Sequence, residues 1–245
     1  MNFQVTGAGE LIWQTGLFTR SKTTKFTLSN AEHTTGSRDR DKMLFFKLIL
    51  LVTAISFISY LLTTTIVDVV LLGRLDFYFS AKDFLITKAN RIDFQDGFKC
   101  SGFSSAFVMR HWNISADGNS AYEKMPNKMR GGYVYPKGIF NFLSKNGFKV
   151  KYCRGNLNSL KNEVATGNPV IAMIKIRPDK NWLHYIPVVG YDGQNIFVAE
   201  SLAELSNCNE PHYNRRIPAK EFKKLWNTAM PKMPLYANTF FTVER

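Results

Sequence analysis

The feature that most restricts the fold is an apolar run from Leu48 to Val67, which contains no charged residue. A helix of these twenty residues is about 30 Å long, which matches the hydrocarbon core of a bilayer. The alternative is a buried helix of a soluble protein, but such helices are rarely apolar on every face over this length. We therefore predict a transmembrane signal anchor over residues 43–73.

The charges on the two sides of this run predict its orientation. Four cations lie just before it, whereas one cation and two acids follow: Arg38, Arg40, Lys42 and Lys47, then Arg74 with Asp68 and Asp76. By the positive-inside rule the N-terminus is cytoplasmic and residues 75–245 lie outside the cytoplasm. No small-residue cleavage site follows the run, so we expect the anchor to remain uncleaved.

The segments around the anchor differ in composition. Residues 1–42 are rich in Thr, Ser, Gly and charge without a sustained period, which predicts a flexible tail. Translation from Met43 is the alternative, because Met43–Lys47 followed by the apolar run resembles the start of an export signal. We expect a linker over residues 74–90 and one folded domain over residues 91–245.

The composition argues against disorder and against nucleic-acid binding. Hydrophobic residues make up 45% of the chain and aromatic residues 14%, which is enough for a packed core. The net charge of +13 is compatible with a nucleic-acid partner, but the basic residues are scattered and no nucleic-acid-binding motif is present. An anionic envelope or acidic substrates account for the charge equally well. We expect no nucleic-acid partner.

From Cys100 onwards the pattern places helices before strands. Helical spacing predicts a helix that begins at Cys100 and two more over 139–145 and 157–166, whereas β-rich runs occupy 170–176, 184–191, 196–199 and 238–243. Asp192-Gly193 predicts a hairpin turn, and 218–226 predicts a late helix. Helices followed by an antiparallel sheet indicate an α+β fold.

Four residues of this region supply the groups that a cysteine nucleophile requires. In chain order they are an amide, a thiol, an imidazole and a carboxylate: Gln95, Cys100, His184 and Glu200. A thiol needs an imidazole to become a thiolate at neutral pH, and the imidazole needs an acceptor that fixes its tautomer. The N–H groups and dipole of a helix that begins at Cys100 would also favour the thiolate. These residue types predict covalent catalysis with an oxyanion donor.

The segments Gln95–Gly102, His184–Asp192 and Val198–Ser201 resemble the papain-like cysteine peptidases of the bacteriocin-processing type, which cut double-glycine leader peptides, and especially their stand-alone relatives. In that family a Gln precedes the Cys by five or six residues, and an Asp follows the His by about sixteen. Here the spacings are five and sixteen. The resemblance covers about residues 90–245 and implies a papain-like fold with Cys100 as nucleophile, His184 as base, Glu200 as orienting group and Gln95 as oxyanion donor.

Two departures and one rival accompany this resemblance. The family's Cys-Gly-Pro is Cys100-Ser101-Gly102 here, and its Asp is replaced by Glu200. Asp192 is the rival for the orienting role, although an Asp before Gly in a hairpin is explained by turn chemistry. His111 lies about 16 Å along the helix from Cys100, too far for a direct contact.

The remaining thiols and imidazoles carry no site of their own. Cys153 and Cys208 would lie in an extracytoplasmic domain, where a disulfide between them is one option, but three cysteines permit other answers. No paired Cys or His spacing typical of a metal site is present, so we expect neither a metal nor a cofactor.

The sequence therefore predicts a membrane-anchored extracytoplasmic cysteine peptidase that hydrolyses a peptide or protein substrate. The transporter relatives carry an ATPase domain that is absent here, so a separately encoded transporter is a candidate partner. Two alternatives stay open: an acyl or peptidyl transferase with the same thiol chemistry, and a catalytically silent peptide-binding domain of the same fold.

Overall fold

The computed structural model describes residues 5–6, 10–11, 32–68, 81–229 and 236–245. It divides into two compact units, Met1–Ser59 and Tyr60–Arg245. Most of the expected tail lies outside the described residues. The same holds for the first part of the expected linker, residues 74–80, with Arg74 and Asp76.

The described residues of the first unit form a pair of short strands and most of a long helix. Strands β1 (Val5–Thr6) and β2 (Glu10–Leu11) pair antiparallel, and helix α1 extends over Glu32–Asp68. The helix therefore begins inside the segment expected to be a tail. Within it, Arg40–Leu61 comprises 22 residues with a mean hydropathy of 2.2, which is long and apolar enough to cross a bilayer.

The second unit is built on a seven-stranded antiparallel sheet. Six strands follow the order β4-β9-β5-β6-β7-β8, and β3 pairs with the end of β6. The strands are β3 (Phe84–Leu85), β4 (Lys149–Arg154), β5 (Val170–Lys175), β6 (Leu183–Tyr191), β7 (Asn195–Val198), β8 (Arg215–Pro218) and β9 (Thr239–Glu244).

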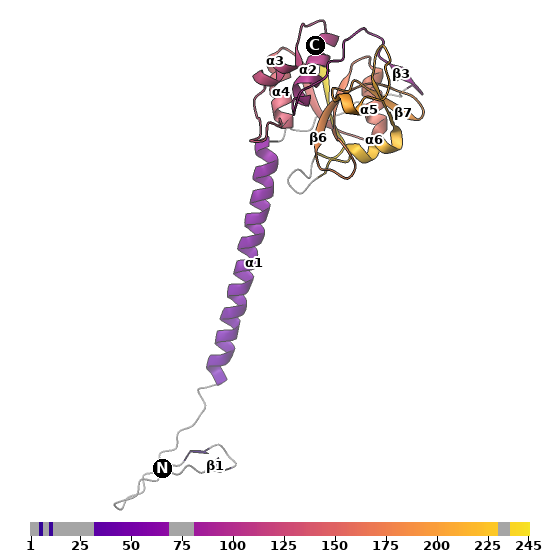
Figure 1. Cartoon of the computed structure of the whole chain (residues 1–245). Coiled ribbons are helices and arrows are strands. Elements are labelled where there is room, and N and C mark those ends of the chain that lie inside the picture. The colour runs from indigo at the N-terminus through magenta and orange to yellow at the C-terminus, as the bar shows by residue number, and fades with distance from the viewer. Residues whose placement is uncertain (1–4, 7–9, 12–31, 69–80, 230–235) are drawn as a thin grey trace, which may run out of the picture. The chain divides into compact units, whose positions relative to one another are not determined.

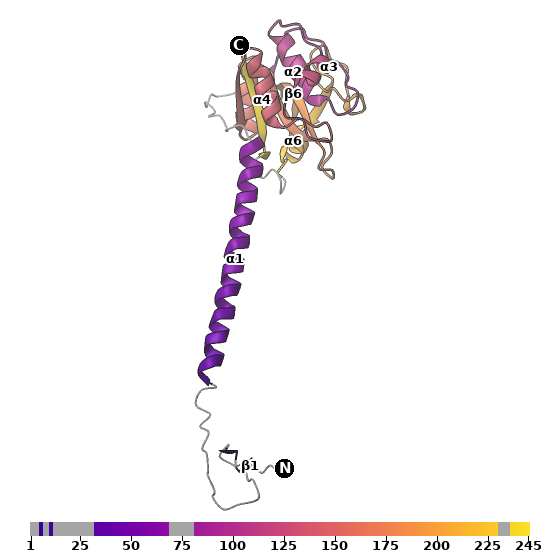
Figure 2. The same ribbon diagram turned by 90° about the vertical axis from the view of Figure 1, so that its left-hand side faces the viewer.

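Helices cover both faces of this sheet. The first face carries α2 (Cys100–His111), α3 (Gly118–Lys124) and α4 (Pro136–Lys145), and the second carries α5 (Leu157–Ala165) and α6 (Ala219–Trp226). Figure 1 shows the two groups on opposite sides of β6, and Figure 2 shows the same unit turned by 90°.

Side-chain alternation along the strands explains the two layers. On β5, Ile171 and Met173 pack in the cluster with α2 and α4, whereas Val170, Ala172 and Ile174 pack in the cluster with α5 and α6. Successive side chains of a strand point to opposite faces, so a strand that is apolar throughout needs cover on both sides. The continuous apolar run of β5 is thus a consequence of its central place in the sheet.

The α+β class is confirmed, with helices first and the antiparallel sheet second. The expected helices and strands after Cys100 are present within one to three residues of their predicted ends. The structure adds α3, β4 and β8, which the sequence pattern did not reveal, and the three-residue 3₁₀ helix Ala203–Leu205. It also places β3 inside the expected linker, where Ile86 is buried in the core, so part of that linker belongs to the domain.

Candidate active site

Cys100 is the first residue of α2, the helix that crosses the middle of the second unit. Eleven of the twelve residues of α2 are buried, and Cys100 itself is 6% exposed. Lys99 at the N-cap makes no capping hydrogen bond through its side chain. Because the first backbone N–H groups of a helix have no intrahelical partner, they favour a negative charge at this end of α2.

The two residues after Cys100 explain one departure from the family pattern. A Cβ atom at Gly102 would lie 2.3 Å from the backbone oxygen of Gly118 and 2.6 Å from Cβ of Tyr122. Only glycine therefore permits the close approach of α2 to α3. Ser101 is 1% exposed. The Ser101-Gly102 pair thus serves the packing of a buried helix.

His184 lies on β6 beside the thiol and contacts the predicted carboxylate. Its Nε2 atom is 2.7 Å from Oε1 of Glu200, and the two side chains are 1% and 0% exposed. Because Nε2 contacts Glu200, Nδ1 is the ring nitrogen that is left for the hydrogen bond with the Cys100 thiol. Burial lowers the pKa of His184, but the charge of Glu200 and hydrogen bonds with Cys100 and Glu200 outweigh it and raise the pKa to about 10. The imidazolium form is thereby stabilised.

Glu200 is held by donors from three directions. Oε1 also accepts a hydrogen bond from the backbone N–H of Leu202 (2.8 Å), and Oε2 accepts one from Nη1 of Arg215 (2.8 Å). Burial raises the pKa of Glu200, but His184 and Arg215 outweigh it and lower the pKa to about 2. The group is therefore a carboxylate at neutral pH, with both oxygens occupied.

Asp192 has a different role. Its Oδ1 atom accepts hydrogen bonds from the backbone N–H groups of Gln194 (2.7 Å) and Asn195 (2.6 Å) in the turn between β6 and β7. These bonds help to lower the pKa of Asp192 against the opposing effect of burial. The carboxylate that contacts His184 is Glu200, and Asp192 stabilises the hairpin.

Two residues of this cluster were missed by sequence reasoning. The side chain of Asn214 makes two hydrogen bonds with the backbone of Glu200. Its Oδ1 atom accepts from the N–H of Glu200 (2.7 Å), and its Nδ2 atom donates to the carbonyl of Glu200 (2.9 Å). Arg215, the next residue, is the buried cation that pairs with the carboxylate. In the four-residue strand Arg215–Pro218, buried and exposed residues alternate, so Arg215 lies on the same face as Ile217. A pattern of four residues is too short to assign a site from the sequence.

Gln95 lies in the loop before α2 and is tied to the residue after Glu200. Its backbone N–H donates to the carbonyl of Ser201 (2.8 Å), and its Oε1 accepts from the Ser201 hydroxyl (2.7 Å). One N–H of Nε2 donates to the carbonyl of Gly97 (2.7 Å). Since an amide carries two N–H groups, the second is not used by this bond.

The other thiols and His111 are separate from this cluster. All three cysteines are unpaired, so Cys153 and Cys208 do not form a disulfide. Burial raises the pKa of Cys153 to about 11, and it also raises that of Cys208. Burial lowers the pKa of His111 at the far end of α2. Among the described residues, no group of three His, Cys, Asp or Glu side chains lies close enough to hold a metal.

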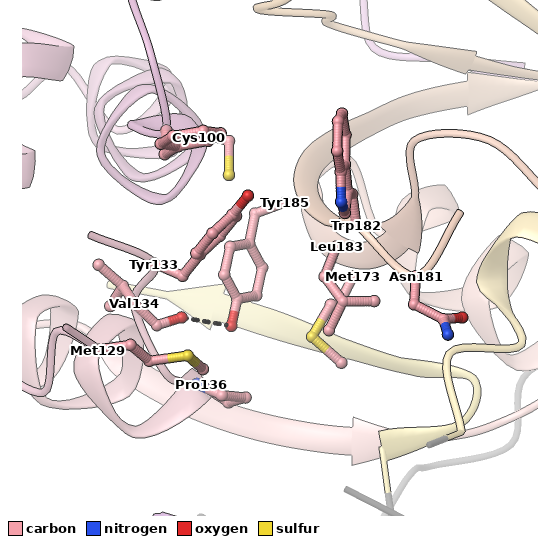
Figure 3. Close-up of a pocket in the computed structure, with 11 residues that line it drawn as sticks. Cys100, Met129, Tyr133, Val134, Pro136, Met173, Asn181, Trp182, Leu183 and Tyr185 are labelled. Carbon is pink, nitrogen blue, oxygen red and sulfur yellow. Dashed lines mark hydrogen bonds between the residues drawn. The ribbon is translucent and has the colours of Figure 1, made fainter. Parts of the chain in front are cut away.

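A cavity of about 260 Å³ adjoins Cys100. Figure 3 shows the sulfur of Cys100 pointing toward Tyr133 and Tyr185, with Met173, Trp182 and Leu183 across the space. Burial raises the pKa of the Tyr133 phenol, and the charge of Cys100 adds to this effect. The thiol is thus buried from bulk solvent but opens onto a cavity.

Comparison with known proteins identifies the family of this chain. The profile of the Peptidase_C39 like family matches residues 88–232, which is more than half of the chain. The chain belongs to this family. The matched range includes Gln95, Cys100, His184 and Glu200. No curated protein matches the chain.

Solved structures are similar to this Peptidase_C39-like chain at low sequence identity. A protein from Bacillus anthracis described as a C39-like peptidase is 13% identical, with a TM-score of 0.50 over 66% of this chain and 97% of that one. The peptidase domain of Streptococcus ComA, a bi-functional ABC transporter involved in quorum sensing, is 13% identical, with a TM-score of 0.48 over 64% and 98%. A double glycine motif protease from the AMS/PCAT transporter, in complex with the leader peptide, is 13% identical, with a TM-score of 0.46 over 65% and 96%.

Proposed function

We propose that this Peptidase_C39-like chain is a membrane-anchored cysteine peptidase that hydrolyses peptide bonds through Cys100, His184 and Glu200. The observation that carries the proposal is the placement of His184, which is buried between the thiol at the start of α2 and a carboxylate 2.7 Å away. A nucleophile, a base and an orienting acceptor in contact are the elements of a catalytic triad.

The first half of the reaction forms a thioester. The Cys100 thiolate attacks the peptide carbonyl carbon, and the resulting oxyanion accepts hydrogen bonds from the Cys100 backbone N–H and the second N–H of the Gln95 amide. His184 then donates its proton to the leaving nitrogen, and the C–N bond breaks. The amine product leaves, and the acyl group remains on sulfur.

The second half releases the acyl group. Neutral His184 accepts a proton from a water molecule as the water oxygen attacks the thioester carbonyl, and the C–S bond then breaks. Glu200 keeps the Nε2 proton in place throughout and stabilises the imidazolium. Arg215 and the Leu202 N–H hold the carboxylate so that it faces His184.

We further propose that α1 anchors the enzyme in the membrane with its N-terminus in the cytoplasm. The apolar segment Arg40–Leu61 and the cations before it support this orientation. The anchor corresponds to residues 43–73, the linker follows it, and the peptidase domain extends to Arg245. Peptide or protein substrates then meet the site outside the cytoplasm, where a separately encoded transporter would deliver them.

Thiol labelling tests the nucleophile. Iodoacetamide alkylates thiolates, so at pH 7 it should label Cys100 of the full chain in detergent before Cys153 and Cys208, whose pKa values burial raises. Mass spectrometry of the digested chain measures each site. Equal labelling of the three cysteines, or none at Cys100, would remove the activated thiolate from the proposal.

Turnover of a quenched fluorescent peptide library tests the triad. Cys100→Ala should abolish cleavage, and Glu200→Gln should lower it by a factor on the order of 10² or more, because the orienting charge is lost. Asp192→Asn is the matched control and should change cleavage little, since Asn also serves a turn. Cleavage products that appear only with an added amine acceptor would indicate a transferase, and labelling at Cys100 without any turnover would indicate a binding domain.

A further inference from the structure

Glu200 occupies the position at which the family pattern has an aspartate, and both oxygens of its carboxylate contact a buried partner. Oε1 lies 2.7 Å from Nε2 of His184, and Oε2 lies 2.8 Å from Nη1 of Arg215. The two partners approach the carboxylate from different strands, β6 and β8. Because the Glu200 side chain is 0% exposed, no bulk water is available to replace either contact.

The backbone of Glu200 is held as well as its side chain. The Asn214 side chain accepts a hydrogen bond from the Glu200 N–H and donates one to the Glu200 carbonyl. Asn214 is buried and lies directly before Arg215, at which β8 begins. Pairing of β7 with β8 holds this junction, because Arg215 is the register partner of Val198, two residues before Glu200. The main chain at position 200 is thus bonded to the same segment that supplies the cation.

These contacts restrict the length of the side chain at position 200. An aspartate is shorter than a glutamate by one methylene group, so its carboxylate would lie about 1.5 Å further from both partners if the backbone stays in place. Contacts of 2.7 and 2.8 Å would then lengthen to about 4 Å, beyond the range of roughly 2.7–3.2 Å for an N–H···O hydrogen bond. A rotation of the shorter side chain toward one partner would move it away from the other.

We propose that Asn214 and Arg215 are positioning residues that make glutamate, and not aspartate, the residue required at position 200. The inference rests on the proposed function, because the positioned carboxylate is the one that orients His184. Neither positioning residue lines the cavity at Cys100, so both act on the reaction only through Glu200. The aspartate of the family pattern therefore impairs this site. The departure at Glu200 and the buried pair Asn214–Arg215 are parts of one arrangement.

Replacement of Glu200 by Asp in the full chain in detergent tests the requirement. The substrate is a fluorescent peptide, taken from the library, that the parent chain cleaves. In Glu200→Asp the value of kcat should fall about tenfold or more while KM stays unchanged, because the altered group orients the base and does not contact substrate. Glu204→Asp is the matched control, since it shortens an exposed side chain by the same methylene group, and it should leave kcat unchanged. A Glu200→Asp variant with the kcat of the parent would overturn the proposal.

The rate at which iodoacetamide alkylates Cys100 at pH 6 gives a readout that does not depend on turnover. The reagent reacts with the thiolate, which is stabilised by the imidazolium of His184 while the carboxylate holds that ring. Glu200→Asp and Arg215→Met should each slow the alkylation about tenfold. Arg215→Lys retains the positive charge and should recover part of the rate. The exposed control Arg216→Met should react at the parent rate.

Asn214→Ala removes both side-chain bonds to the Glu200 backbone and should also slow the alkylation. Thermal unfolding of each variant separates positioning from a structural role. A lower Tm together with parent rates of alkylation in Asn214→Ala and Arg215→Met would refute positioning.

The proposed function and this inference fail in different ways. A parent chain that cleaves no peptide of the library refutes hydrolysis, and the alkylation rates then still decide whether position 200 requires glutamate. Alkylation of Glu200→Asp at the parent rate refutes the inference even when the parent chain hydrolyses peptides.

Discussion

Replacement of Arg215 by Met tests whether the buried carboxylate depends on its second cation. Nη1 of Arg215 lies 2.8 Å from Oε2 of Glu200, and the side chains are 8% and 0% exposed. Met removes the guanidinium while keeping a long apolar stem of similar length. Oε2 then has no cation, whereas Oε1 keeps His184 and the Leu202 N–H. The variant should therefore be less stable than the parent chain.

The magnitude follows from the burial of the pair. Removing one partner of a buried ion pair costs about 3–5 kcal/mol, because an uncompensated charge remains in the interior. Glu200 keeps His184 as a second cation, so we expect the lower end of this range, about 3 kcal/mol. For a domain of this size, 1 kcal/mol lowers Tm by about 2–4 °C, which predicts a decrease of about 6–12 °C.

The assay is thermal unfolding of the full chain in detergent, followed by tryptophan fluorescence, since Trp226 is buried in the core. The double variant Arg215→Met with Glu200→Gln should be more stable than Arg215→Met alone, because it removes the charge that was left unpaired. Arg216→Met is the matched control. Arg216 is the next residue of β8 and its side chain is exposed. Its contacts with the rings of Phe197 and Tyr213 are therefore weak, and its loss should lower Tm much less than the loss of Arg215.

Two results would refute this reasoning. One is a Tm of Arg215→Met equal to that of Arg216→Met, which would mean that the carboxylate does not need the guanidinium. The other is a double variant whose loss of Tm equals the sum of the two single losses. That outcome would mean that the two side chains act independently.

Three further predictions follow from the same structure. The pKa of Glu200 is lowered to about 2, so the stability that this carboxylate contributes should be lost as pH falls from about 4.5 toward 2. The pKa of His184 is raised to about 10, so the stability that the imidazolium contributes should be lost as pH rises from about 6.5 toward 10. Tm measured against pH checks this, and the acid loss should shrink in Glu200→Gln. Gly102→Ala should destabilise the chain by about 1–3 kcal/mol in thermal unfolding, because its Cβ would meet the Gly118 oxygen at 2.3 Å. An Ala variant as stable as the parent chain would contradict the close packing of α2 on α3. A reporter that is active only after export should be active when fused after Arg245 and inactive when fused near residue 35, and the reverse pattern would place the peptidase domain in the cytoplasm.

Local sequence patterns were sufficient to predict many of the helices and strands. Helical spacing after Cys100 and the run of apolar residues in β5 each depend on neighbours a few positions away, so they could be read from the chain. Strand β8 has four residues and β3 has two, which is too short for periodicity to separate from a loop. These strands exist because β7 and β6 present edges to which they can bond.

The candidate site also has one part that the sequence predicts and another that only the structure decides. The types and order of Gln95, Cys100, His184 and Glu200 indicate thiol chemistry from the sequence alone, because each residue lies in a recognisable local motif. The choice between Glu200 and Asp192 could not be made in that way. It depends on which carboxylate the pairing of β6 with β7 and the turn geometry bring to the imidazole.

The sequence by itself determined the apolar segment Leu48–Val67, the α+β order, and Cys100 and His184 as the candidate thiol and imidazole, since these are properties of composition and spacing along the chain. Only the tertiary structure decided that Glu200 faces His184, that Arg215 neutralises its second oxygen, and that a cavity opens beside Cys100. These features join residues up to 87 positions apart, such as Phe98 and Tyr185. Contacts over such distances arise only when the sheet and its helices pack, so no local pattern encodes them.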